Sequence, residues 1–297
     1  MRCLVFGGTG MLGQAVVAEA RSRGWAALGL SRSQADIAEI ADRERLLGWA
    51  DAFRPEVVVN CAAFTKVDAC ETETERAFAV NGDAVANAAA VAERAGARLV
   101  HVSTDYVFDG AAKTPYDEEA PTVPLSVYGR SKLAGEAHAL ACERGLVVRT
   151  SWLFGSGGPN FVATMVGLIE AGRVPLRVVR DQEGCPTYAP FLARALLDLA
   201  RLGVTGVVHY RNREPVSWYA FAAEIARLWP GGPGAVEVLP ITTAEFPRPA
   251  PRPAWSVLDV TRFEGLAGRR VEPWEWGLVE TLRHLRQERE LRKGRRG

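Results

Sequence analysis

The chain has 297 residues, which is enough for one large domain or two interlocked domains with a sizeable hydrophobic core. Hydrophobic residues make up 48% and charged residues 24% of the chain, as in ordinary globular proteins, and the net charge is +1. Such an even charge balance argues against nucleic acid or an acidic membrane surface as the main partner.

The cysteines and histidines give no sign of a disulfide framework or a metal site. The five cysteines are dispersed and include no CxxC pair, which is typical of a reduced cytosolic protein. The four histidines form no HxxxH or HxH group, so we expect no bound metal. No apolar run approaches the roughly 20 residues of a membrane span. Because the chain opens directly on an apparent strand, with no room for a signal peptide, we expect a cytoplasmic protein.

The first 154 residues alternate short apolar runs with helical patterns. Strands are predicted near residues 3–7, 25–31, 56–63, 98–108 and 146–154. Helices are predicted near residues 11–24, 42–55 and 73–96, and around 127–136. This alternation predicts an α/β protein with a Rossmann-like, doubly wound parallel sheet, whose strands all end at the edge where ligands bind.

After Phe154 the pattern changes to shorter, mixed elements. We therefore predict an NAD(P)-binding Rossmann domain over residues 1–154 and a smaller mixed α/β substrate-binding lobe over residues 155–297. Some later segments are expected to return to the first domain. The charged end of the chain, from about residue 287, is expected to be a frayed tail.

A glycine-rich turn joins the first strand to the first helix. "FGGTGMLG" places Gly7, Gly10 and Gly13 in a GxxGxxG pattern. Such glycines allow a tight turn, close approach of a pyrophosphate and tight packing of helix on sheet, and the first helical residues, Met11 and Leu12, offer free N–H groups. The alternative is a turn that needs glycine for its geometry alone. In this strand–turn–helix context, the pattern predicts dinucleotide binding, and the absence of GK[ST] excludes a P-loop.

The end of the second strand bears on the choice of dinucleotide. No acid is present there to bind the ribose 2′-hydroxyl of NAD, whereas Ser31, Arg32 and Ser33 could accept a 2′-phosphate. NADPH is therefore favoured, with NADH as the alternative, and Arg32 could equally be an exposed loop arginine. Asp36 and Ile37 follow closely and are predicted to contact the adenine.

A tyrosine and a lysine are spaced for one helix face. Tyr128 and Lys132 in "VYGRSKLAGE" lie four residues apart, a spacing also found in ordinary surface pairs. However, the strand that ends in "HVSTDYVFDG" brings Ser103 or Thr104 to the same sheet edge. Side chains alternate along a strand, and we favour Thr104 as the hydroxyl that faces the cleft.

These motifs together resemble the extended short-chain dehydrogenase/reductases, and among them the dTDP-4-dehydrorhamnose reductases. The pair Tyr128 and Lys132 is typical of the whole superfamily. Narrower similarity lies in "STDYVFDG", "DQEGCPT" and "RPAWSVLD", and matching segments continue from "GGTGMLGQ" to "EPWEWGL", over nearly the whole chain.

The resemblance implies an NADPH-dependent enzyme that reduces the C4 keto group of dTDP-4-dehydro-L-rhamnose. In this interpretation Tyr128 is the general acid, with a pKa lowered by the Lys132 ammonium and the nicotinamide, and Thr104 donates a hydrogen bond to the reacting oxygen. Lys132 also holds the nicotinamide ribose, and Asp105 is expected to touch the sugar.

Further site residues follow from the resemblance. Ala62, Ala63 and Phe64 are expected to line the cofactor cleft, although Phe64 stands where the family more often has tyrosine, which removes a hydroxyl hydrogen bond. Trp152 would offer a flat face to the sugar ring or else belong to the core. Arg252 would pair with the nucleotide diphosphate or else brace its proline-rich loop. The loop that joins the lobes is expected to be shaped by Asp181, Gln182, Pro186 and Thr187.

Two other interpretations remain open at this point. Related reductases and epimerases act on other nucleotide sugars with the same tyrosine and lysine. A non-catalytic regulatory subunit, such as that of methionine adenosyltransferase, can also share the fold, although the intact set of Thr104, Tyr128 and Lys132 argues against it. The resemblance is compatible with a homodimer.

Overall fold

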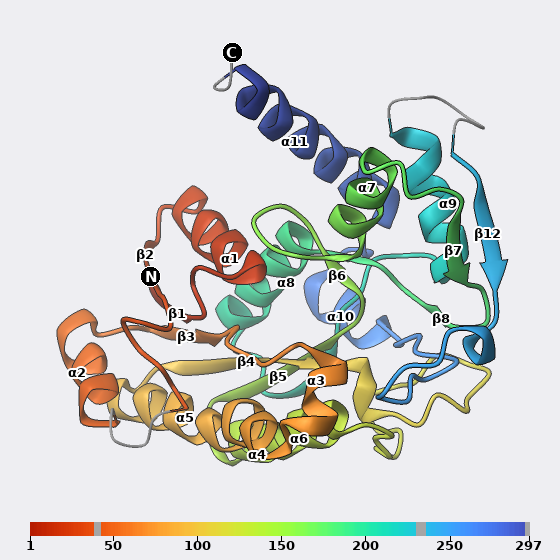
Figure 1. The fold of residues 1–297 in the computed structure, drawn as a ribbon. Helices are drawn as coiled ribbons and strands as arrows, with labels where there is room; N and C mark the ends of the chain where they lie inside the picture. Colours follow the sequence, from red (N-terminus) through yellow and green to blue (C-terminus); the bar gives the residue numbers. More distant parts are fainter. Residues whose placement is uncertain (39–42, 230–235, 295–297) are drawn as a thin grey trace.

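A six-stranded parallel sheet forms the centre of the molecule. The computed structural model describes residues 1–38, 43–229 and 236–294 (Figure 1). The strands lie in the order β2-β1-β3-β4-β5-β10, and all neighbouring pairs are parallel. Their bounds are β1 Arg2–Phe6, β2 Ala26–Leu30, β3 Val57–Asn60, β4 Arg98–Thr104, β5 Gly145–Thr150 and β10 Gly206–His209.

Helices cover both faces of this sheet (Figure 1). Cys3 and Val5 of β1 point into a core with α1 (Met11–Ser22), α8 (Ala189–Leu202) and α10 (Thr261–Ala267). Leu4 and Phe6 point the other way, into a core with α2 (Arg43–Phe53), α5 (Ala84–Ala95) and α6 (Val127–Ala141). The alternation of strand side chains thus buries both faces, and the predicted Rossmann-like α/β fold is confirmed.

The strand order places the ligand edge. From β1 the chain adds β2 on one side and then crosses to β3 on the other side. Ligands of doubly wound sheets bind at such a switch point, beside the carboxyl ends of the strands. The glycine turn after β1 and Cys61 to Phe64 after β3 therefore lie at the binding edge.

Part of the second half of the chain belongs to this sheet. The strand β10 pairs with β5, from Gly206 beside Leu146 to His209 beside Arg149. Both α8 and α10 pack on the same core as α1. The Rossmann layers therefore draw on segments well beyond residue 154.

A smaller lobe stands beside the sheet. Its apolar core joins α7 (Phe161–Glu170), α9 (Trp218–Leu228) and α11 (Trp274–Gly294) to β7 (Leu176–Val179) and β12 (Val238–Ile241). The strands β7 and β12 are parallel, β6 (Leu153–Phe154) pairs with β9 (Thr187–Tyr188), and β8 (Glu183–Gly184) pairs with β11 (Val216–Ser217). The segment from residue 287, expected to fray, is instead helical as far as Gly294, because it continues α11.

Several predicted elements are shorter than expected or divided. The strand predicted over 146–154 stops at Thr150, because Trp152 adopts a positive φ of 45°. The helix predicted over 73–96 is divided into α4 (Thr74–Phe78), a π-helical turn η2 (Ala79–Asp83) and α5. A separate short helix, α3, spans Val67–Thr72, and a 3-10 turn, η3 (Asp105–Val107), ends the strand predicted over 98–108 at Thr104.

No helix within residues 1–38, 43–229 and 236–294 combines the length and apolar character needed to cross a membrane.

Candidate active site

The glycine turn forms a cradle against the backbone. Gly7 has a φ of 71°, which favours glycine, and Gly10 N–H donates to the Gly7 carbonyl oxygen at 2.9 Å. A methyl group on Gly13 would collide with that same oxygen. Gly10 is the N-cap of α1 and has no side chain, and the free N–H groups and positive dipole end of a helix N-terminus favour a phosphate. These residues fit the diphosphate of a dinucleotide.

The loop after β2 has a less open arrangement. Arg32 Nε lies 2.6 Å from Asp36 Oδ2, and the Arg32 side chain is 68% exposed. The Asp36 Oδ1 atom accepts a hydrogen bond from the Ala38 amide at 3.1 Å. Ile37 is buried in the core beneath α5, and its carbonyl accepts a hydrogen bond from Asn87. Arg32 and Asp36 thus lie at the surface, whereas the Ile37 side chain points inward.

Thr104, Asp105 and Tyr128 come together where β4 meets α6. The Thr104 hydroxyl donates to Asp105 Oδ1 at 2.9 Å and accepts from the Tyr106 amide at 3.2 Å. Thr104 lies close enough to Tyr128 to act on the pKa of its phenol, and the Tyr128 ring meets the Tyr106 ring edge-on, with centroids 5.6 Å apart. The other oxygen of Asp105, Oδ2, is buried without a partner, and burial raises the pKa of this carboxyl to about 6.

Burial determines the direction in which the pKa of Tyr128 shifts. Burial raises the pKa of its phenol above the ordinary value, and the Asp105 carboxylate adds to the rise. The nearby Thr104 hydroxyl lowers the pKa, but its effect does not outweigh burial. Without the cofactor, the pKa of Tyr128 is therefore raised, because the cost of desolvating a phenolate dominates. The lowered pKa beside Lys132 and the oxidised nicotinamide stays a prediction.

Lys132 lies deep beneath the cleft, with a side chain only 2% exposed. Its Nζ donates to the Val102 carbonyl oxygen at 2.7 Å and lies 3.4 Å from His101 Nε2. Burial lowers the pKa of Lys132 to about 8, although the Glu136 carboxylate opposes the shift. The spacing of Tyr128 and Lys132 thus belongs to a buried face of α6 and not to a surface ion pair.

A buried ion pair fixes α6 to the sheet. Glu136 lies one turn after Lys132, and its carboxylate accepts two hydrogen bonds from Arg149 of β5, at 2.9 and 2.7 Å. Ser103 donates to the same carboxylate at 2.5 Å. The Ser103 hydroxyl is thus bound to Glu136, whereas the Thr104 hydroxyl contacts Asp105.

Backbone contacts position the segment after β3. The Ala62 amide donates to Asn60 Oδ1 at 3.1 Å, and the Phe64 amide donates to Asn81 Oδ1 at 2.8 Å. The side-chain amide of Asn81 donates to both the Phe64 carbonyl and the Ser131 hydroxyl. Ala62 and Ala63 are half-buried, whereas the Phe64 ring is buried beneath Arg76. Asn81 holds this segment from the π-helical turn, a feature that often marks functional sites.

Trp152 lies between the sheet and the smaller lobe. Its ring stacks on Trp218, with centroids 3.5 Å apart and an angle of 8° between the planes. Its positive φ is an uncommon and costly conformation for a bulky residue, and such strain concentrates at functional sites. Trp218 thus covers one face of the ring that was expected to meet the sugar.

Arg252 is an ion-pair partner of Asp68. Its Nη1 lies 2.5 Å from Asp68 Oδ1, and Arg248 Nη2 lies 2.5 Å from Asp68 Oδ2. Asp68 belongs to α3, so these contacts tie the proline-rich segment to the Rossmann layers. The Arg252 guanidinium opposes the rise that burial causes in the pKa of Tyr106, whose ring meets the Tyr128 ring edge-on. It therefore braces its loop at the rim of the site.

The loop that joins the lobes is held by polar contacts. Asp181 accepts hydrogen bonds from Thr243, and Gln182 donates to the Thr243 hydroxyl at 3.0 Å. The Thr187 amide, which follows Pro186, donates to the Trp152 carbonyl oxygen at 3.1 Å. These residues shape the backbone around Trp152.

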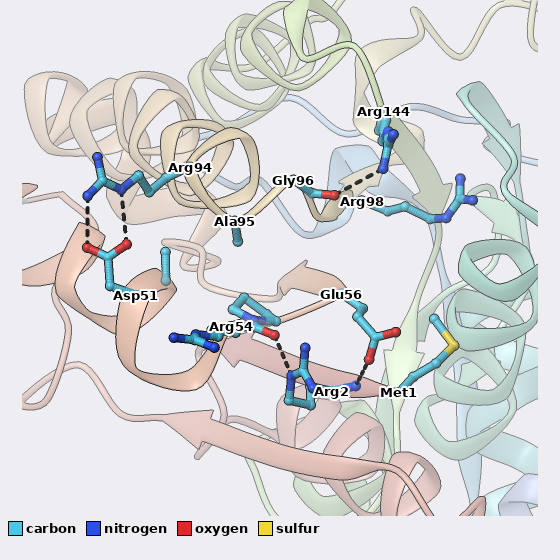
Figure 2. Close-up of a pocket in the computed structure, with 12 residues that line it drawn as sticks. Met1, Arg2, Asp51, Arg54, Glu56, Arg94, Ala95, Gly96, Arg98 and Arg144 are labelled. Carbon is cyan, nitrogen blue, oxygen red and sulfur yellow. Dashed lines mark hydrogen bonds and ion pairs between the residues drawn. The ribbon is translucent and has the colours of Figure 1, made fainter.

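A pocket of about 670 Å³ opens at the opposite edge of the sheet (Figure 2). It is lined by the first residues of β1 and β4, Arg2 and Arg98, and by further arginines. Arg144 donates to the Gly96 carbonyl and Arg2 to the Arg54 carbonyl, so these side chains satisfy helix ends. None of the predicted site residues lines this pocket.

The described ranges contain no group of three His, Cys, Asp or Glu side chains placed to hold a metal ion.

Known proteins share both this sequence and this fold. The family model for the RmlD substrate binding domain matches residues 1–287. The chain is 43% identical to the dTDP-4-dehydrorhamnose reductase of Mycobacterium tuberculosis, over 95% of this chain and 92% of that protein. The chain belongs to the dTDP-4-dehydrorhamnose reductase family. The family predicted from the motifs is therefore confirmed.

Two further relatives bear on the cofactor and the sugar. The dTDP-4-dehydrorhamnose reductase of Bacillus anthracis, solved in complex with NADP, has a TM-score of 0.88 and 33% identity, over 95% of this chain and 99% of that one. A Streptomyces antibioticus protein described as a probable dTDP-4,6-dihydroxy-2-methyloxan-3-one 4-ketoreductase is 40% identical, over 95% of both chains.

Several residues that build the site had not been predicted. Asn60, His101, Asn81, Glu136 and Arg149 are all buried and hydrogen-bonded there. The available signal was a polar residue inside an apolar strand, as in "VVVN" and "RLVHVST". Such residues are rarely buried without a partner.

Proposed function

We propose that the protein reduces the C4 keto group of dTDP-4-dehydro-L-rhamnose to give dTDP-L-rhamnose, with NADPH as the reductant. The observation that carries the proposal is that Thr104 lies beside Tyr128 at the end of β4, on the sheet edge that holds the glycine cradle, with Lys132 buried one turn further along α6. The shared family, with members that carry this activity in their names, supports it.

The reduced nicotinamide supplies a hydride to the sugar C4. The residues of the chain manage the charge that this creates on oxygen. Tyr128 gives its proton to the oxygen as it becomes an alkoxide, and its raised pKa keeps the phenol protonated and ready until then. Thr104 turns its hydroxyl from Asp105 toward the oxygen and stabilises the developing charge. Lys132 as an ammonium stabilises the phenolate that remains.

The substrate contacts are proposed from the same geometry. Asp105 Oδ2 is buried next to Thr104 and has no hydrogen-bond partner, so it could accept a hydrogen bond from a sugar hydroxyl. Trp218 covers one face of the Trp152 ring, so the sugar would contact the part of the ring that Trp218 leaves uncovered. Arg252 lies at the rim of the site. Because its guanidinium already binds Asp68, it would be shared between Asp68 and the nucleotide diphosphate.

The cofactor contacts are assigned to Gly7, Gly10, Met11, Leu12 and Gly13 for the diphosphate. Arg32, with Asp36 and the Ile37 backbone, would lie at the adenosine end, and Ala62, Ala63 and Phe64 would line the cleft. The exposed guanidinium of Arg32 suits a 2′-phosphate, which favours NADPH over NADH. A family member solved with NADP supports this choice.

We assign residues 1–154 with β10, α8 and α10 to cofactor binding and most of the remaining segments to the substrate lobe. The cytoplasm is the proposed location, because nucleotide sugars and NADPH are intracellular metabolites.

The test is an assay of NADPH oxidation with the proposed substrate. Purified protein is mixed with NADPH and dTDP-4-dehydro-L-rhamnose, and loss of the nicotinamide absorbance is followed together with the sugar product. We expect rapid oxidation and dTDP-L-rhamnose as product. Bound NADPH without oxidation would overturn the proposal and leave a reductase of another nucleotide sugar or a regulatory subunit to be tested.

A second candidate function is reduction of a different dTDP-linked keto sugar. The Streptomyces antibioticus relative, nearly as similar as the rhamnose enzymes, carries such an activity in its name. Assays with both keto sugars at equal concentration separate the candidates, because the ratio of their kcat/KM values measures the preference of the site.

A further inference from the structure

Three buried polar side chains form a row that leads from β3 through β4 to α6, the helix that carries Tyr128. Asn60 ends β3, His101 lies in β4, and Lys132 lies in α6, and their side chains are at most 2% exposed. The Asn60 Nδ2 atom is 3.2 Å from His101 Nδ1, and His101 Nε2 is 3.4 Å from Lys132 Nζ. The proposed reaction assigns no role to Asn60 or His101.

The hydrogen bonds determine where the protons in this row of side chains lie. Asn60 Oδ1 accepts from the Ala62 amide at 3.1 Å, so the Asn60 NH₂ group must face His101. It donates to His101 Nδ1, which therefore carries a lone pair. A neutral imidazole with a lone pair on Nδ1 has its proton on Nε2, and that N–H points at Lys132.

This tautomer of His101 favours the neutral form of Lys132. An ammonium has only donors, so a charged Lys132 would face another donor across 3.4 Å. A neutral amine, in contrast, accepts from His101 Nε2–H and still donates to the Val102 carbonyl oxygen at 2.7 Å. Both contacts are satisfied only in the neutral form.

Other groups around the lysine and the histidine do not change this pattern. Glu136 on α6 favours the ammonium through its charge, but its carboxylate is bound to Arg149 and Ser103. The Cys61 thiol, after β3, stays protonated because burial raises its pKa. His101 stays neutral because burial and Lys132 both lower its pKa. The Tyr128 phenol stays protonated as well.

We propose that Asn60 and His101 are positioning residues that fix one imidazole tautomer behind Lys132 and so make this lysine give up its proton more readily. The effect of this arrangement on catalysis rests on the proposed reductase function, whereas the protonation of His101 and Lys132 does not. Burial alone would also favour a neutral lysine, so the specific claim is the directed N–H of His101.

The consequence for the reaction follows from charge. When Tyr128 transfers its proton to the sugar oxygen, the phenolate needs a neighbouring cation. Only the ammonium form of Lys132 supplies it, so the rate should fall as pH rises through the Lys132 pKa, which burial lowers to about 8. Asn60 and His101 would thereby set the basic limit of activity.

The first test needs no substrate. Protein labelled with nitrogen-15 in histidine and carbon-13 at lysine Cε is titrated by NMR without cofactor. His101 should carry its proton on Nε2, whereas His209, whose Nδ1 faces the Tyr116 carbonyl, should carry it on Nδ1 in the same spectrum. Among the four lysines, Lys132 should be the one that titrates near pH 8. His101 protonated on Nδ1 in the wild type would overturn the proposal.

Variants test the coupling. Asn60→Asp keeps the acceptor for the Ala62 amide but turns the group facing His101 into an acceptor, which should move the imidazole proton to Nδ1. The Lys132 midpoint should then rise by about one pH unit or more. His101→Leu removes the N–H and should also raise it. If His101→Leu does not fold, the wild-type tautomer and Asn60→Asp still decide, and an unchanged Lys132 midpoint in Asn60→Asp would contradict the proposal.

Activity then tests the catalytic consequence. The basic limb of kcat against pH should move upward in Asn60→Asp together with the Lys132 midpoint. A midpoint that moves while the limb stays would remove Asn60 and His101 from the control of turnover. A wild type that oxidises no NADPH at any pH would instead sink the proposed function and leave the NMR result standing.

Discussion

Tyr128 combines a protonated phenol with neighbours that stabilise its anion only when the reaction needs it. Burial and Asp105 raise the pKa of the phenol, whereas the nearby Thr104 lowers it, and Lys132 is proposed to stabilise the phenolate during the reaction. A general acid of this kind is protonated over the whole physiological range. Its worth in catalysis can therefore be measured without a confounding change of protonation state.

Tyr128→Phe removes the proton donor and keeps the ring that packs on Tyr106. We expect kcat to fall by about 10²–10⁴-fold, the usual contribution of a positioned general acid. NADPH affinity, measured by fluorescence titration, should change little. A loss of kcat smaller than about tenfold would remove Tyr128 from this role.

Arg32→Ala tests the choice of dinucleotide. The Arg32 side chain is 68% exposed and contacts Asp36, at the end of the strand that would carry the adenosine ribose. We expect weaker binding of NADPH and unchanged binding of NADH, measured as dissociation constants for both. Equal losses for the two cofactors would show that Arg32 does not contact the 2′-phosphate.

Local spacing made the glycines and the pair Tyr128 and Lys132 predictable at the scale of single residues. The partners that hold them were not, because Glu136 meets Arg149 and Asn60 meets His101 only through the packing of the sheet. The raised pKa of Tyr128 in the chain without cofactor was not visible in the sequence for the same reason. Burial depends on the whole fold, whereas the charge of a nearby lysine is visible in the sequence.

At the scale of elements, α1 depends on a close approach between its first turn and the glycine loop. A methyl group at Gly13 would collide with the Gly7 carbonyl oxygen, whereas one at Gly48, in α2, would meet open space. Gly13→Ala should therefore abolish measurable NADPH binding. Gly48→Ala should stabilise the protein by roughly 0.5–1 kcal/mol through helix propensity and leave NADPH binding intact. Normal NADPH affinity in Gly13→Ala would contradict the assignment of the cradle.

The position of α6 depends on the buried pair of Glu136 and Arg149, whose side chains are 2% and 5% exposed. Glu136→Gln leaves the guanidinium buried without a countercharge, which should lower the free energy of unfolding by about 3–5 kcal/mol. Urea unfolding measures this loss. The double variant Glu136→Gln with Arg149→Met should recover part of it, and a double variant less stable than either single variant would rule out the pair as the cause.

The regular elements followed from the sequence because apolar runs and turn glycines are local signals. The π-helical turn at Ala79–Asp83 was not predictable, since it exists where Asn81 reaches Phe64 and Ser131. Nor did periodicity show that β10 joins β5, because strand pairing across 60 residues leaves no local pattern.

At the scale of the whole molecule, the two halves are joined by polar contacts as well as by the sheet. Asp68 of α3 binds Arg248 and Arg252, and His209 of β10 contacts both the Tyr116 carbonyl and Arg149. The proposed site lies where these connections meet. Its geometry should therefore be sensitive to conditions that weaken the packing between the halves.

Acid should weaken that packing through His209. Burial lowers the pKa of His209 to about 3 in the folded chain, against an ordinary value of 6.5, and Arg149 adds to the shift. The unfolded chain thus binds more protons between these values, so the stabilisation is complete above pH 6.5 and is lost as pH falls toward 3. At pH 5 the loss should be about 2 kcal/mol.

Thermal unfolding of His209→Gln between pH 5 and 8 measures this contribution, with the exposed His138→Gln as the control. The pH dependence should be weaker in His209→Gln than in the wild type and unchanged in the control. Parallel curves for all three proteins would exclude His209 as a source of acid sensitivity.

In the proposed reaction, a hydride passes from NADPH to C4 of a dTDP-linked keto sugar. Transfer of an isotope label from the cofactor to the sugar would show this step. NADPH deuterated at the reactive nicotinamide carbon is incubated with the protein and dTDP-4-dehydro-L-rhamnose, and the product is analysed by mass spectrometry and NMR. The account predicts dTDP-L-rhamnose with one deuterium at C4, formed by the wild type and only very slowly by Tyr128→Phe. Absence of product, or product without deuterium at C4, would contradict it.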